Sequence, residues 1–155
     1  KQIAFIGVDE TDQAVGVSRK KGYLDAMKEA NLEVEKSWVQ KGIFDVESGS
    51  ECMKQIINES RIKPTAVLTV TDRLAIGAMQ TIKQYGLSIP GDIAVAGMGA
   101  SELSRFITPS LTTVDFAIED AGRESALMIL GEIERKVLNG EKRKITYRLV
   151  ERESI

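Results

Sequence analysis

Short apolar runs alternate along the chain with segments in which apolar residues recur every three or four positions. The apolar runs lie at residues 3–8, 34–40, 65–70 and 92–97, and the helical patterns lie at residues 18–32, 46–60 and 74–86. This order predicts βαβ units and therefore a doubly wound α/β fold, with a mostly parallel sheet and right-handed crossovers. Several runs show little polar alternation, which is expected when helices cover both faces of the sheet.

The last part of the chain departs from this alternation. A long helix is predicted over residues 118–139. Residues 139–142 then form a turn, and residues 144–154 alternate as a final strand that places Ile145, Tyr147 and Leu149 on one face. The helix carries one continuous apolar stripe, made of Gly122, Ala126, Ile129, Leu130, Ile133 and Val137.

Distinctive side chains follow the predicted strands. In open parallel sheets ligands bind beyond the carboxyl ends of the strands, where Arg19, Phe44, Asp72 and residues 98–101 fall. A polyol ligand needs charged hydrogen-bonding groups and an aromatic face, which Arg19, Asp72 and Phe44 together supply. Read singly, Arg19 fits a surface charge and Phe44 a core aromatic. Asp72 alone fits a helix cap, because it stands at a helix start and its carboxylate accepts backbone N–H bonds.

Composition excludes several classes of function. Lys and Arg number 21 against 23 Asp and Glu, and the net charge of −2 gives no basic field for binding nucleic acid. The absence of histidine removes the commonest general base and metal ligand, so we predict no enzyme, catalytic residue, metal or cofactor. No apolar run approaches the roughly 18 residues of a membrane span, and the single cysteine, Cys52, fits a reducing compartment.

Two local patterns suggest other chemistry. Residues 97–102 contain the first two glycines of a dinucleotide-binding fingerprint, but Glu102 stands at the third position, which favours a simple glycine turn. Asp9, Glu10 and Asp12 cluster after the first strand, where oxygen ligands suit Mg²⁺. No partner motif accompanies them, so a solvated acidic loop is the favoured interpretation.

The sequence TAVLTVTDRLAIGAMQTIKQYGLSIPGDIAVAGMG, followed by TPSLTTVD, resembles the effector-binding core of LacI/GalR-type transcriptional repressors. The segments RKKGYLDAM and YRLVERES extend the resemblance over nearly the whole chain. It implies a periplasmic-binding-protein-like core of two doubly wound subdomains around a sugar cleft. By this resemblance residues 1–114 form the C-terminal subdomain, residues 115–140 a crossover helix that packs on the first subdomain, and residues 141–155 a returning strand. The first subdomain and the DNA-binding headpiece are expected to lie outside this chain.

The resemblance also implies roles for particular residues. Arg19 matches an arginine that contacts effector, Phe44 an aromatic that stacks on it, and Thr71 a further contact, with Asp72 holding its loop. Met98 and Ile118 stand where relatives have aromatic residues facing the cleft. Relatives carry acidic residues after the fourth strand, where this chain has Gly99 and Ala100, so the identity of the effector is open between a sugar and a sugar phosphate.

The function implied is that of a cytoplasmic, sugar-responsive repressor that is a homodimer and contacts operator DNA only through the headpiece. The dimer surface is expected at Leu74, Ile76, Met79 and Ile107. The alternative is the sugar-binding component of an ABC importer, which has the same fold. If the first subdomain is absent, the stripe on the long helix should fold back, dimerise or swap between copies, because an exposed patch of this size favours association.

Overall fold

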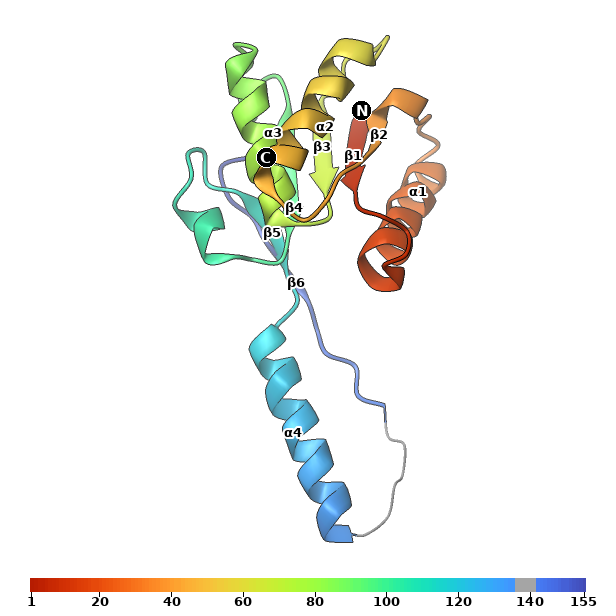
Figure 1. Cartoon of the computed structure of the whole chain (residues 1–155), viewed down its shortest axis with the longest axis vertical. Helices are drawn as coiled ribbons and strands as arrows, with labels where there is room; N and C mark the ends of the chain where they lie inside the picture. The colour runs from red at the N-terminus through yellow and green to blue at the C-terminus, as the bar shows by residue number, and fades with distance from the viewer. Residues whose placement is uncertain (136–141) are drawn as a thin grey trace.

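The computed structural model describes residues 1–135 and 142–155 and contains one six-stranded sheet flanked by helices (Figure 1). The strands are β1 (Ile3–Gly7), β2 (Val39–Lys41), β3 (Ala66–Thr69), β4 (Ala94–Met98), β5 (Thr112–Asp115) and β6 (Arg148–Val150). The helices are α1 (Arg19–Glu29), α2 (Val46–Glu59), α3 (Asp72–Gln84) and α4 (Ile118–Arg135). Shorter turns are the π-helical η1 (Gln13–Ser18) and the 3₁₀-helical η2 (Lys36–Trp38) and η3 (Glu102–Arg105).

The strand order is β2-β1-β3-β4-β5-β6, in which only β6 runs antiparallel to its neighbour. Because parallel crossovers are right-handed, α1 lies on one face of the sheet, and α2 and α3, which lead the chain back across it, lie on the other. The predicted fold class, a doubly wound and mostly parallel α/β sheet, is therefore confirmed.

The core fills the space between the sheet and its helices. Phe5 of β1 stacks on Tyr23 of α1, with ring centroids 4.9 Å apart, and burial raises the pKa of Tyr23 to about 12. On the other face α2 and α3 approach so closely that glycines stand at the contact, at Gly49 and Gly77. The strand β1 is buried on both of its faces, whereas β3 and β4 alternate between buried and half-buried residues, so one face of these two strands is only partly covered.

Several other predicted elements differ from the observed ones in where they begin or end. The second strand is shorter than predicted, because Lys36–Trp38 forms a 3₁₀ turn that buries the Trp38 ring. The last strand is confined to β6, since residues 144–147 do not pair in the sheet. The fifth strand, β5, was not predicted. Of the long helix, Ile118–Arg135 is observed, while Val137 and the rest of the predicted helix and its turn up to residue 141 lie outside the described residues.

The helix α4 leaves the body of the molecule and projects away from the sheet (Figure 1). Its apolar residues Leu127, Ile129, Leu130 and Ile133 are all exposed. The expectation that this stripe folds back onto the rest of the chain is therefore wrong, and association with another surface remains as the prediction. Within the described residues, no helix is both long and apolar enough to cross a membrane.

Candidate functional site

The segments that follow β2, β3 and β4 lie at one edge of the sheet, because these strands run parallel within it. A pocket of about 260 Å³ opens there. It is lined by Phe44, Thr71, Asp72, Arg73, Met98, Gly99 and Ser101. Four of the predicted effector contacts thus come together: Phe44 after β2, Thr71 and Asp72 at the start of α3, and Met98 at the end of β4.

The residue that caps α3 is Thr71 and not Asp72. The Thr71 hydroxyl accepts a hydrogen bond from the backbone N–H of Leu74 at 3.4 Å, so Thr71 is the residue that caps α3. Asp72 is the first residue of the helix and its side chain is turned into the protein, where the residue is 3% exposed. The prediction that Asp72 caps the helix is wrong, because tertiary partners hold its carboxylate instead.

The Asp72 carboxylate joins three elements. Its Oδ2 accepts the backbone N–H of Ser101 at 2.6 Å, and its Oδ1 accepts the hydroxyl of Thr113 on β5 at 2.5 Å. The Thr113 hydroxyl in turn accepts the N–H of Ala100. Asp72 therefore fixes the loop after β4 that lines the pocket. The carboxylate fits closely beside Gly97, where an added Cβ would lie 2.5 Å from Asp72 Oδ1.

Arg19 stands outside this pocket, at the start of α1. One of its terminal nitrogens donates to the carbonyl of Val70, the residue before Thr71, and its guanidinium lies over the ring of Phe116, 4.7 Å from the ring centre. Partial burial lowers the pKa of Arg19, and the nearby Asp12 opposes that shift. Arginine stays protonated at neutral pH even when its pKa is lowered. The positive charge of Arg19 therefore lies beside Val70, next in the chain to Thr71 of the pocket.

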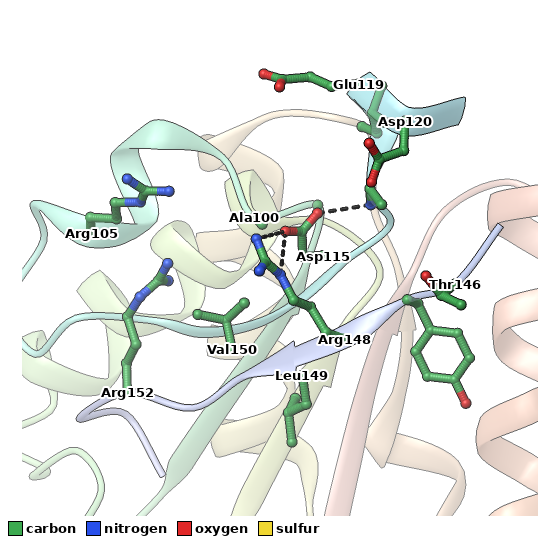
Figure 2. Close-up of a pocket in the computed structure, with 14 residues that line it drawn as sticks. Ala100, Arg105, Asp115, Glu119, Asp120, Thr146, Arg148, Leu149, Val150 and Arg152 are labelled. Atoms are coloured by element: carbon green, nitrogen blue, oxygen red, sulfur yellow. Dashed lines mark hydrogen bonds and ion pairs between the residues drawn. The ribbon is translucent and has the colours of Figure 1, made fainter. Parts of the chain in front are cut away.

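Ile118 is not in this pocket either. It is exposed at the start of α4 and lines a larger, open cavity of about 890 Å³ between α4, the loop after β4 and β6 (Figure 2). Asp115 in this cavity accepts the N–H of Ala117 and the Arg148 guanidinium, and these hydrogen bonds lower the pKa of the Asp115 carboxyl. The cavity is lined by both acidic and basic side chains, including Glu119, Asp120 and Arg152.

The comparisons with known proteins decide the family. The whole chain, residues 1–155, matches the periplasmic binding protein-like domain. The chain belongs to this family. It is 36% identical over all 155 residues to the HTH-type transcriptional repressor PurR of Histophilus somni, covering 46% of that protein. It is 37% identical over 140 residues to PurR of Photorhabdus laumondii, covering 41% of it. The chain thus spans about half the length of these relatives.

Solved structures of the family agree with this assignment. A LacI-family regulatory protein from Chloroflexus aggregans matches with a TM-score of 0.91 and 30% identity, over 99% of this chain and 54% of that one. The transcriptional regulator CelR, in complex with cellobiose, matches with a TM-score of 0.87 and 27% identity, over 99% of this chain and 46% of that one. The predicted likeness to the effector core of LacI/GalR-type proteins is confirmed. The two curated relatives are named as repressors, not as enzymes.

The acidic side chains in the loop after β1 already bond to other groups of this chain. Asp12 accepts the N–H groups of Ala14 and Val15 and so caps η1, while Glu10 pairs with Lys20 at 2.7 Å. Across residues 1–135 and 142–155, no group of three or more carboxylate or cysteine side chains is arranged to hold a metal ion. At residues 97–100 the backbone turns, with positive φ at Gly99 and Ala100, as the glycine-turn interpretation requires.

The Asp9 carboxyl offers a test of this loop. Its Oδ2 accepts Lys41 Nζ at 2.8 Å, and this hydrogen bond, followed by one from the Thr11 N–H, lowers its pKa from 3.8 to about 2. Because the folded pKa lies below the unfolded one, the stabilisation is complete above about pH 4 and is lost as the pH falls towards 2. Lys41→Met should raise the pKa of Asp9 towards its ordinary value in an NMR titration. An unchanged pKa near 2 would show that Lys41 is not the cause.

Sequence reasoning missed Arg73 and Phe116, and it placed Ser101 at this edge of the sheet without giving it a role. Arg73 and Ser101 line the smaller pocket, and Phe116 contacts Arg19. The Ser101 hydroxyl oxygen is buried without a hydrogen-bond partner among the described residues. An aromatic residue between the LTTV segment and a long helix was a visible signal for Phe116, whereas the only signal for Ser101 was its position after the fourth predicted strand.

Of the four residues predicted at the dimer surface, two are buried and two are half-buried. Leu74 and Met79 are buried in the chain's own core, so that part of the prediction is wrong: neither side chain has surface left for a partner. Ile76 and Ile107 are half-buried and keep accessible surface. Two unpredicted residues, Leu103 and Phe106, are exposed in and just after η3, next to Ile107.

Proposed function

We propose that the intact protein is a cytoplasmic, sugar-responsive transcriptional repressor of the LacI/GalR type, and that this chain supplies one half of its effector site. The observation that carries the proposal is the pocket in which Phe44, Thr71 and Met98 meet at the carboxyl edge of the parallel sheet. The Phe44 ring, which is exposed, provides a stacking face for a sugar or sugar phosphate. The names of the curated relatives favour a repressor over an importer component.

The mechanism follows from a site shared between two halves. Effector held between this half and a second one favours whichever relative orientation contacts it best, and that bias shifts the headpieces on or off operator DNA. A coupling free energy of about 1–3 kcal/mol is typical of such a switch. The residues of this chain bind and orient the effector, and operator DNA is contacted by the headpiece alone. No cofactor and no catalytic step are involved.

Isothermal titration of the intact protein with cellobiose and with glucose 6-phosphate tests the proposal. At least one should bind, and Phe44→Ala and Arg19→Met should each weaken binding by about tenfold or more, the size expected for losing a stacking face or a charged hydrogen-bonding group. Lys21→Met, an exposed change on α1, is the control.

Fluorescence anisotropy should then show that the sugar changes the affinity of the intact protein for DNA from its own promoter. Secretion together with sugar binding and no DNA binding would instead support the importer component.

The exposed stripe of α4 packs on the other half of the effector core. This part of the proposal rests on the exposure of Ile129, Leu130 and Ile133, since a contiguous apolar face of this kind marks an interface. The 155-residue chain alone should therefore sediment as a dimer or larger species. Replacing both Leu130 and Ile133 by glutamate should return it to the monomer. A monomeric wild-type chain in analytical ultracentrifugation would contradict the assignment.

The intact protein is a homodimer through the exposed side of α3 and the segment after η3. Ile76 lies on that side of α3, and Lys83 of α3 donates to the carbonyl of Thr108, which holds the segment beside the helix. Phe106, 74% exposed, is its most prominent apolar residue. Phe106→Glu should shift the intact protein towards monomer in sedimentation velocity, while Leu24→Glu on α1 should not. Equal behaviour of the two variants would exclude this surface.

A further inference from the structure

Phe116 and Arg19 come from distant parts of the chain and form one contact. Phe116 lies in the segment that joins β5 to α4, and Arg19 is the first residue of α1. The Arg19 guanidinium carbon stands 4.7 Å from the centre of the Phe116 ring. Both side chains are half-buried, so the contact is partly shielded from water. A guanidinium over an aromatic face is attracted to the electrons of the ring, and the attraction grows with such shielding.

The contact leaves the hydrogen-bonding edge of Arg19 available. A guanidinium has five N–H donors in one plane, and one terminal nitrogen of Arg19 donates to the Val70 carbonyl. The guanidinium lies over the ring of Phe116, and among the described residues its other N–H groups make no hydrogen bond. Two contacts, one in the plane and one on the face, thus fix the orientation of a long and otherwise flexible side chain.

Phe116 itself is held in a turn with little freedom. The carboxylate of Asp115 accepts the N–H of Ala117 at 2.9 Å, and Arg148 of β6 donates to the same carboxylate. Ala117 has a positive φ of 48°, which marks the sharp change of direction between β5 and α4. A displacement of the first turn of α4 relative to α1 would therefore change the position of the Phe116 ring relative to Arg19.

We infer that Phe116 is a positioning residue for Arg19, holding its guanidinium in the orientation that presents the free N–H edge to the effector. The inference rests on the proposed function, because it takes Arg19 as an effector contact. It adds that Arg19 is correctly oriented only while the crossover segment keeps its present place. Effector affinity is thereby tied to the position of α4.

The first test observes Arg19 directly in the intact protein. With ¹⁵N- and ¹³C-labelled arginine, the Arg19 side-chain signals are assigned by their loss in Arg19→Met. They should show an upfield ring-current shift that disappears in Phe116→Leu and persists in Phe116→Tyr, which keeps the ring. Unshifted Arg19 signals in the wild type, or the same shift in Phe116→Leu, would overturn the inference whether or not any sugar binds.

The second test measures affinity for cellobiose and glucose 6-phosphate by titration calorimetry. Phe116→Leu should weaken binding of the recognised sugar by about tenfold, while Phe116→Tyr should stay within about threefold of wild type. In the Arg19→Met background, Phe116→Leu should cause no further loss, because Phe116 acts through Arg19. An equal loss in both backgrounds would make Phe116 a direct contact and overturn the inference. Failure of both sugars to bind the wild type would count against the proposed function, while the arginine signals still decide the inference.

Discussion

Gly77→Ala should lower the free energy of unfolding by about 3 kcal/mol, the upper end of what overpacking a well-packed interior usually costs. Gly77 lies in α3 against α2, where an added Cβ would stand 1.9 Å from the Val46 carbonyl oxygen and 2.6 Å from the Ser50 nitrogen. Both neighbours are backbone atoms, so no side chain can rotate out of the way. The helices must separate instead, which also breaks the hydrogen bond between the Ser50 and Thr81 hydroxyls at 2.6 Å.

Urea unfolding of the chain measures this effect, which should appear as a lower midpoint at unchanged slope. Gly49→Ala, on the facing helix, should behave alike, since its Cβ would lie 2.3 Å from the Leu74 carbonyl oxygen. Gly122→Ala is the matched control. It too lies within a helix, but an added Cβ there meets nothing within 4 Å, and alanine favours the helix by about 1 kcal/mol. Equal midpoints for Gly77→Ala and wild type would mean that α2 and α3 are not in backbone contact.

The sequence predicted the parts of the fold whose residues repeat regularly. In α2 the spacing of Cys52, Ile56 and Ile57, all buried, identified the apolar face of the helix. The strand β5 was missed because its residues 112–115 look polar. Thr112 and Thr113 are nevertheless fully buried, where their hydroxyls bond Arg152 and Asp72, partners from distant parts of the chain. Local patterns do not reveal such partners, and so a buried polar strand resembles a loop.

The same dependence on local patterns explains why some contacts of the site could be predicted and others could not. The carboxyl-end rule was enough to place Phe44, Thr71 and Met98 together, because it depends only on parallel strand order. The contact between Arg19 and Phe116 depends on how the chain leaves β5, which the order of elements does not determine. Likewise, the apolar side of α3 looks the same whether it faces its own core or a second subunit. Leu74 and Met79 both face the core, and the backbone of Leu74 lies against Gly49 of α2.

Asp72→Ala should lower the free energy of unfolding by about 3 kcal/mol as well, for a different reason. It would leave the Ser101 N–H and the Thr113 hydroxyl without their acceptor, and hydrogen bonds to a charged group contribute about 1.5–3 kcal/mol each. The loop after β4 would also lose its attachment to α3. Effector affinity should therefore fall in the intact protein even though both carboxylate oxygens already have protein donors.

Asp45→Ala provides the comparison, because Asp45 also accepts a backbone N–H at a helix start, from Ser48 at 2.7 Å. Asp45 is half-exposed and acts as an ordinary cap, so its loss should cost about 1 kcal/mol and leave effector affinity unchanged. A double-mutant cycle with Thr113→Val separates the two hydrogen bonds of Asp72. If the Thr113 hydroxyl stabilises the fold through Asp72, the double variant should lose less unfolding free energy than the sum of the two single variants. Additive costs in urea unfolding, or equal losses for Asp72→Ala and Asp45→Ala, would show that Asp72 is no more than a helix-end carboxylate.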